Sequence, residues 1–181
     1  NKRKLRNQWV QRGEIEMLAQ WLRWNVQFKH NFGICHGTRS GREQGWFQKF
    51  LRWRNGSVVG TEISDTAVQF PHTMQWDYHD VKDEWVSAAD FVYSNSLDHS
   101  FNPRLAVRQW MRCVDFNGVL LLEHSKFNSY PPKYESGDIF SGTFSDYLKL
   151  VLSINGTEVV DVLHAPLSRS GLVKQSRYIV V

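Results

Sequence analysis

The sequence predicts an α/β fold in which a doubly wound, mostly parallel sheet lies between two layers of helices and ends in an antiparallel hairpin. Three observations lead to this prediction. Short apolar runs alternate with segments of helical periodicity along the chain, as in βαβ units. The run at 118–125, GVLLLEHS, holds four consecutive aliphatic residues, as expected of a strand buried on both faces. The last two apolar runs lie too close together for a helical crossover.

The first expected helix covers residues 14–24. Its apolar residues recur at three- and four-residue spacing, which places them on one face, and they are Ile15, Leu18, Trp21 and Leu22. We expect Trp9 and Trp24 to cover the sheet from this segment as well, rather than to stack on nucleic acid bases.

The parallel part of the sheet is predicted from short apolar runs that end at polar or small residues. These runs are residues 32–35, 57–63, 73–77, 89–95 and 118–125. The helices between them are marked by apolar spacing, by a stop before Pro71 or by Pro103 in a first turn. They are residues 42–51, 65–70 and 103–114.

The carboxyl third has a different pattern. Residues 126–142 are rich in proline and glycine without a clear period, so we expect a long loop such as a lid. Residues 143–156 are expected to form a helix that Gly156 closes. Residues 158–163 and 176–181 are then predicted to form the antiparallel hairpin.

Length and composition favour one domain over residues 1–181, with a leading helical segment at 1–29. The 22 basic and 18 acidic residues form a mixed surface rather than a polycation. Cys35 and Cys113 are the only cysteines, so a disulfide framework is not expected and a reducing, cytoplasmic compartment is the prediction. No apolar run reaches the roughly 20 residues of a membrane span.

Basic residues crowd at the amino end of the chain, as Lys2, Arg3, Lys4, Arg6 and Arg12. One interpretation is a segment that contacts nucleic acid phosphates. The other is a solvated, partly frayed leader. The sequence leaves both open.

The turn at residues 37–41, GTRSG, is the first candidate for a binding site. It joins a predicted strand to a helix whose amino terminus offers free N–H groups, a position where nucleotide-like cofactors bind in doubly wound sheets. Glu62 ends the next strand, and a carboxylate there can accept hydrogen bonds from both ribose hydroxyls. A dinucleotide fingerprint would require glycine where this chain has Arg39 and Arg42, so a nicotinamide cofactor is disfavoured.

The order of motifs resembles that of the class I S-adenosylmethionine (SAM) dependent methyltransferases, which have a Rossmann-like fold. The resemblance covers residues 30–181, taken as a SAM-binding core, and it rests on ICHGTRSG, VVGTEIS, QWDYHDV, ADFVYSNSLDHSFNP, GVLLLEHS and the terminal EVVDVL and SRYIVV. The segment from SLDHSFNP to GVLLLEHS is the most specific part.

The resemblance implies SAM as the cofactor and a role for each matching position. Glu62 is implied at the ribose, with Ile63 beside it. Residues at the methionine part are implied to be Gly37, Thr38, Arg39 and Gly41. The adenine is implied to contact Asp77 and the Tyr78 backbone, and the sulfonium is implied to lie beside Ser94 and Asn95.

Two positions depart from the pattern of the family. An acidic residue is usual two positions before the first glycine, where this chain has Cys35, and a glycine is usual at Arg39. The Arg39 guanidinium is a candidate partner for the methionine carboxylate, and projection into solvent is the alternative.

Methyl transfer requires a positioned nucleophile and, for a hydroxyl or a protonated amine, a base. Candidates near the ends of the fourth and fifth strands are Asp98, His99 and His124, with Glu123 as a further carboxylate. The alternative for each histidine is a structural role in a loop, and the alternative for each carboxylate is a solvated side chain at a strand end. The histidines lack close metal-ligand spacing, so no metal site is predicted.

The methyl acceptor is expected to be a small molecule or a saccharide that is methylated on an O or N atom. An RNA or protein acceptor remains an alternative through the basic leader. Two rival functions are a catalytically degenerate SAM-fold module, which would not transfer a methyl group, and a nicotinamide-dependent oxidoreductase.

Overall fold

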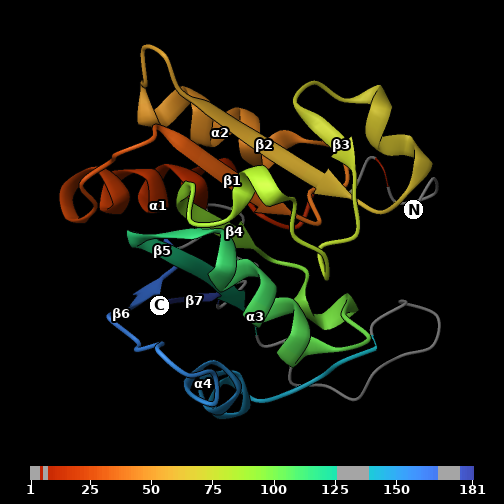
Figure 1. Cartoon of the computed structure of the whole chain (residues 1–181), viewed down its shortest axis with the longest axis vertical. Helices are drawn as coiled ribbons and strands as arrows, with labels where there is room; N and C mark the ends of the chain where they lie inside the picture. The colour runs from red at the N-terminus through yellow and green to blue at the C-terminus, as the bar shows by residue number, and fades with distance from the viewer. Residues whose placement is uncertain (1–4, 6–7, 126–138, 167–175) are drawn as a thin grey trace.

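The computed structural model describes residue 5 and residues 8–125, 139–166 and 176–181. Its centre is a seven-stranded sheet with the order β3-β2-β1-β4-β5-β7-β6 (Figure 1). The strands are β1 Phe32–His36, β2 Ser57–Glu62, β3 Thr73–Gln75, β4 Ala89–Ser94, β5 Val114–His124, β6 Asp161–His164 and β7 Arg177–Val180. Strands β1 to β5 run parallel, and β7 pairs antiparallel with both β5 and β6. The predicted fold class, including its terminal hairpin, is confirmed.

Helices cover both faces of the sheet. The α-helices are α1 Arg12–Asn25, α2 Arg42–Leu51, α3 Pro103–Cys113 and α4 Phe144–Leu152, and the 3₁₀ helices are η2 Asp65–Gln69, η3 Asp83–Trp85 and η4 Leu97–His99. One apolar core packs α1 and α2 against the sheet, and the other packs α3 and α4 against the opposite face. The chain therefore has the three layers that its alternating pattern predicts.

Alternation along each strand divides the buried side chains between these two cores. In β1, Ile34 lies in the core under α3, and Cys35 lies in the core under α1 and α2. In β4, Val92 faces the core under α3 and α4, and Tyr93 faces the core under α1 and α2. Every residue of β4 is buried, as expected of a central strand that is covered on both faces.

Three sequence predictions are corrected in detail. Strand β5 begins at Val114, directly after α3, whereas we expected it from 118. Helix α4 ends at Leu152, and Gly156 instead lies in the following turn with φ +82°. Trp9 is 52% and Trp24 81% exposed, so neither covers the sheet. Trp24 lies nine positions after the buried Ile15, which at 3.6 residues per turn is about half a turn away from the buried face.

Several predictions fall partly outside the described residues. Most of the predicted lid, 126–138, lies there, as do residues 1–4 and 6–7 of the basic leader. Within the described part, Cys35 and Cys113 are both free and buried. None of the described helices is long and apolar enough to cross a membrane.

Candidate functional site

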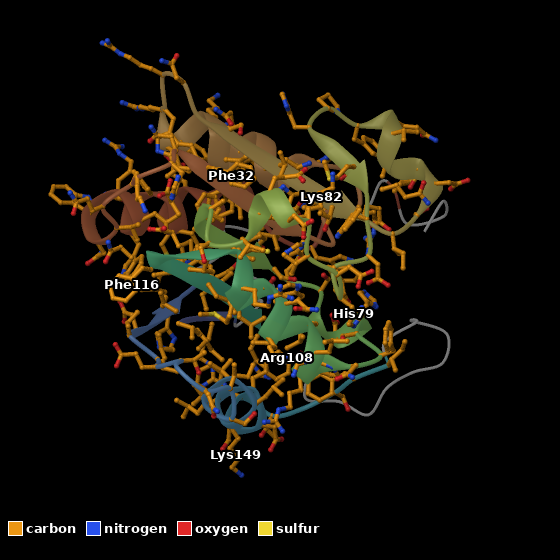
Figure 2. All side chains as sticks on the ribbon, in the orientation of Figure 1. Phe32, His79, Lys82, Arg108, Phe116 and Lys149 are labelled. Carbon is orange, nitrogen blue, oxygen red and sulfur yellow. The ribbon has the colours of Figure 1, made fainter. Side chains whose placement is uncertain are left out.

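The candidate site lies at the carboxyl ends of the parallel strands, where β1 is flanked by β2 on one side and β4 on the other. The strand order reverses at this point, which is the usual ligand position in doubly wound sheets. Figure 2 shows His79 on the side toward which the parallel strands point and Phe116 on the opposite side. The loops after β1, β2, β3 and β4 therefore meet on the side of His79.

The turn 37–41 is fastened to the end of β2. The backbone N–H groups of Gly37 and Thr38 both donate to the carbonyl of Thr61, at 2.8 and 3.0 Å. Three of the five residues have left-handed backbone, with φ of +72° at Gly37, +47° at Arg39 and +70° at Gly41. Glycine adopts this conformation without steric cost, so the spacing of the two glycines follows from the shape of the turn.

Arg39 occupies a position that favours glycine. A non-glycine residue in the left-handed region is strained by an amount on the order of 1 kcal/mol. The Arg39 side chain is partly buried, and its positive charge lies near the carboxylate of Glu43. Arg39 thus keeps a backbone conformation that glycine would adopt without strain.

The loop after β4 closes over Gly37. A Cβ atom at Gly37 would lie 2.0 Å from Oγ of Ser96 and 3.7 Å from the Tyr78 ring. The hydroxyls of Ser94 and Ser96 both donate to the carbonyl of His36, each at 3.3 Å. The structure therefore brings the predicted residues Gly37, Tyr78 and Ser94 together, and it adds Ser96, which the sequence analysis missed.

Glu62 ends β2 as predicted and is 5% exposed. Its Oε1 accepts a hydrogen bond from the backbone N–H of Ser64 at 2.9 Å. Beside it, a pocket of about 260 Å³ is lined by Ile63, Gln75, Trp76, Asp77 and Asp80. The structure thus places Ile63 and Asp77, which the family resemblance assigns to the nucleoside, around one hollow next to Glu62.

Tyr78 is surrounded by predicted site carboxylates. Burial, followed by the negative charges of Asp98, Asp77 and Glu62, raises the pKa of the Tyr78 phenol well above its usual range. The Tyr78 hydroxyl donates to the carbonyl of Ser96 at 3.1 Å. Residues from the ends of β2, β3 and β4 therefore converge on this one side chain.

His79 links the loop after β3 to the loop after β4. Its Nδ1 lies 2.7 Å from Oδ1 of Asp77, and its Nε2 lies 2.7 Å from Oγ of Ser100. We assign the Nδ1 proton to the Asp77 bond, so that Nε2 accepts from Ser100. The hydrogen-bonded series Asp77–His79–Ser100 therefore connects the loop after β3 to the loop after β4. The sequence carried no signal for the contact between His79 and Ser100, because these residues are 21 positions apart along the chain.

Asp98 and His99 lie in η4, beside the first described residues after the gap at 126–138. The carbonyl of Asp98 accepts hydrogen bonds from the backbone N–H groups of Ile139 and Phe140, both at 2.9 Å. Two residues further along, the carbonyl of Gly142 lies 3.0 Å from Nε2 of His124 at the end of β5. The segment 139–142 therefore connects two predicted catalytic residues, Asp98 and His124.

The His124 imidazole is buried under α4. It packs against Tyr147, with ring centroids 4.7 Å apart, and it is 1% exposed. Burial lowers the pKa of His124 below its usual value. With the proton on Nε2 donated to Gly142, the Nδ1 lone pair has no hydrogen-bond partner in the described part of the chain. A neutral imidazole with an unused lone pair has the chemistry of a base.

Glu123 points to the opposite face from His124, as neighbours in a strand must. Its Oε1 accepts from the hydroxyl of Ser176 at 2.7 Å, and it is 6% exposed. Glu43, in the first turn of α2, is buried on the same face. Sequence analysis missed Glu43, although its position two residues after Gly41 was a signal.

Among the described residues, no group of three or more His, Cys, Asp or Glu side chains has an arrangement that could hold a metal ion.

Comparison with solved structures shows that this fold is shared with methyltransferases. The sequence matches no protein-family model and no curated protein. One similar structure is the complex of the Haloferax volcanii Trm112 methyltransferase activator with a methyltransferase, with a TM-score of 0.66, 14% identity and coverage of 93% of this chain and 88% of that chain.

Two further solved structures share the fold. A SAM-dependent methyltransferase from Aquifex aeolicus has a TM-score of 0.63 at 11% identity and covers 95% of this chain and 98% of its own. The Burkholderia thailandensis 1,6-didemethyltoxoflavin N1-methyltransferase, bound to its substrate and to S-adenosylhomocysteine, has a TM-score of 0.64 at 9% identity, with coverage of 92% and 75%. The chain therefore has the Rossmann-like fold of the class I SAM-dependent methyltransferases.

Proposed function

We propose that this chain is a SAM-dependent methyltransferase that transfers a methyl group to an O or N atom of a small molecule or a saccharide. The observation that carries the proposal is the left-handed turn 37–41, fastened at the switch point beside the buried carboxylate of Glu62. This arrangement suits a ligand that carries a ribose and an amino acid group.

The described residues fit the chemical groups of SAM. The Glu62 carboxylate suits the ribose hydroxyls, and the hollow between Ile63 and Asp77 suits the adenine. Arg39 on the turn suits the methionine carboxylate. The Thr38 hydroxyl is buried without a hydrogen-bond partner within the described ranges, so it is available to a ligand at the turn.

The chemistry would divide between cofactor and protein. SAM, when bound, supplies an electrophilic methyl group. The protein holds the acceptor in line and takes its proton, and His124 is the residue best suited to that role because its Nδ1 lone pair is unused. In this proposal Ser94 and Asn95 lie beside the sulfonium, and Asp98 and His99 orient the acceptor from η4.

A small acceptor is supported by the Burkholderia thailandensis structure, whose name records a small-molecule substrate. The basic leader keeps an RNA acceptor as the second candidate. We also propose that residues 1–181 form one domain, with a leading segment 1–29 and a core 30–181. The hydrogen bond from Tyr178 in β7 to Glu14 in α1 supports this unit, since it joins residues 164 positions apart.

The experiment is calorimetric titration with SAM and S-adenosylhomocysteine, with NAD as the control ligand. We expect micromolar binding of the first two and none of NAD. Binding of SAM with no transfer to any acceptor in a broad panel would favour the degenerate module, and binding of NAD alone would contradict the proposal.

Glu62→Ala is expected to weaken S-adenosylhomocysteine binding by about 1.5–3 kcal/mol, because it removes hydrogen bonds between a carboxylate and two hydroxyls. Glu62→Gln is the matched variant, since its amide oxygen still accepts from Ser64. Wild-type affinity in Glu62→Ala would show that Glu62 does not hold the ribose.

A further inference from the structure

The proposed cofactor carries an α-ammonium group, and a buried ammonium requires a charged or strongly polar acceptor. Cys35, at the end of β1 below the turn, does not supply one. Its thiol is fully buried, and burial, with the nearby charge of Glu43, raises its pKa well above the usual value, so it stays neutral. This inference rests on the proposed function.

Glu43 is a buried carboxylate close enough to Cys35 for its charge to raise the pKa of the thiol. It lies in the first turn of α2, directly after the turn 37–41, and is 4% exposed. Its Oε1 accepts from Nε2 of Gln8 at 2.8 Å, whereas Oε2 is buried with no hydrogen-bond partner in the described part of the chain. A buried carboxylate oxygen without a partner is costly, and such atoms commonly mark the place of a ligand.

The groups around Glu43 come from each element packed against it. Burial, with a smaller contribution from the charge of Glu123, raises the pKa of Glu43 to about 7, although its own backbone N–H, Gln8 and Arg39 each act to lower it. Tyr93 and Cys35 also lie close, because the charge of Glu43 raises the pKa of each. A cation beside Oε2 would therefore be attracted by two carboxylates and repelled by one guanidinium.

We propose that the Glu43 carboxylate binds the α-ammonium of SAM and so replaces the acidic side chain that β1 lacks at Cys35. Glu43 and Arg39 then form a complementary pair, in which the carboxylate takes the ammonium and the guanidinium takes the carboxylate of the same amino acid group. Both side chains belong to one strand-turn-helix unit, so their separation is set by local structure.

The test measures, by calorimetry, the affinity of the wild type and of Glu43→Gln for each of two ligands. The ligands are S-adenosylhomocysteine and its deamino analogue, which keeps the carboxylate and lacks only the ammonium. We expect Glu43→Gln to lower the affinity for S-adenosylhomocysteine at least tenfold and to change the affinity for the deamino analogue less than twofold. Glu43→Gln keeps the oxygen that accepts from Gln8, so the variant retains this contact.

Glu14→Gln is the matched control, because Glu14 is equally buried on the same face but lies in α1, away from the turn. It should bind both ligands as the wild type does. An equal loss of both ligands in Glu43→Gln would overturn the inference in favour of a structural role, and unchanged affinities would overturn it outright. A wild-type protein that binds neither ligand would instead contradict the proposed function itself.

A pH series gives a second readout. Since Glu43 must be ionised to hold the ammonium, the wild-type affinity for S-adenosylhomocysteine should fall as the pH drops below about 7. The affinity of Glu43→Gln, and that of the deamino analogue, should not follow this change. A fall of the same size in Glu43→Gln would assign the titration to another group and overturn the inference.

Discussion

At the scale of single residues, Arg39 combines a backbone cost with a proposed binding role. Its φ of +47° is a conformation that glycine adopts freely. Arg39→Gly should therefore raise the free energy of unfolding by about 1 kcal/mol and weaken S-adenosylhomocysteine binding about tenfold. Urea unfolding and calorimetry on the same variant check the two halves. A gain in stability with no loss of affinity would show that Arg39 is strained but does not bind the methionine carboxylate.

His36 is a second residue whose effect is local. Its ring stacks on Trp110 at 5.5 Å, its Nδ1 lies 2.9 Å from Oγ1 of Thr61, and burial lowers its pKa to about 3. The unfolded chain binds the proton near pH 6.5 and the folded chain does not, so stability falls as the pH drops below 6.5.

The size of this effect can be measured against a variant that does not titrate. Between pH 7.5 and pH 5, His36 should cost the wild type about 2 kcal/mol of unfolding free energy, from about 1.4 kcal/mol per pH unit. His36→Gln should lack this part of the pH dependence in urea unfolding, while the other titrating groups contribute equally to both proteins. An identical pH dependence in both would show that folding does not lower the pKa of His36.

At the scale of elements, the turn after β1 and the loop after β4 are built against each other. Gly37→Ala would place a Cβ 2.0 Å from Oγ and 2.7 Å from Cβ of Ser96, in a backbone conformation with φ +72°. We expect a loss of about 2–4 kcal/mol in unfolding free energy, from left-handed strain and overpacking together.

The control for this prediction is Gly45→Ala in α2, where an added Cβ meets nothing within 4 Å. It should stabilise the protein by about 1 kcal/mol, since alanine is the better residue inside a helix. Equal effects of the two substitutions would mean that the turn and the loop after β4 do not pack as described.

At the scale of the whole molecule, the two ends of the described chain are tied together. The Tyr178 hydroxyl in β7 donates to Glu14 in α1, and both side chains are buried. Tyr178→Phe leaves a buried carboxylate oxygen without this donor, so the unfolding free energy should fall by about 2–3 kcal/mol.

Tyr93→Phe is the matched control on the same face, because the Tyr93 hydroxyl has no hydrogen-bond partner in the described residues. Its removal should cost less than about 0.5 kcal/mol or stabilise the protein. Both variants are compared by urea unfolding. A loss in Tyr93→Phe as large as that in Tyr178→Phe would contradict the contribution of the bond between β7 and α1.

Local chemistry made much of this fold predictable. The aliphatic run of β5, Pro103 at the start of α3 and the glycine spacing of the turn each depend on neighbours in the sequence. Element bounds were less predictable, as the early start of β5 shows. The exposure of Trp24 followed from helical spacing, since Trp24 lies half a turn away from Ile15, and the sequence analysis did not apply that spacing to it.

The candidate site also combines features that local sequence predicts with contacts that only the packed structure shows. The sequence by itself determined the α/β class, the antiparallel end of the sheet and the cluster of Gly37, Glu62, Asp77 and Ser94 at strand ends, because period, turn residues and strand order are local or topological properties. Only the tertiary structure decided that Ser96 closes over Gly37, that His79 joins Asp77 to Ser100 and that Glu43 is buried beside Cys35. These contacts depend on distances between separate elements, which the packing of side chains sets.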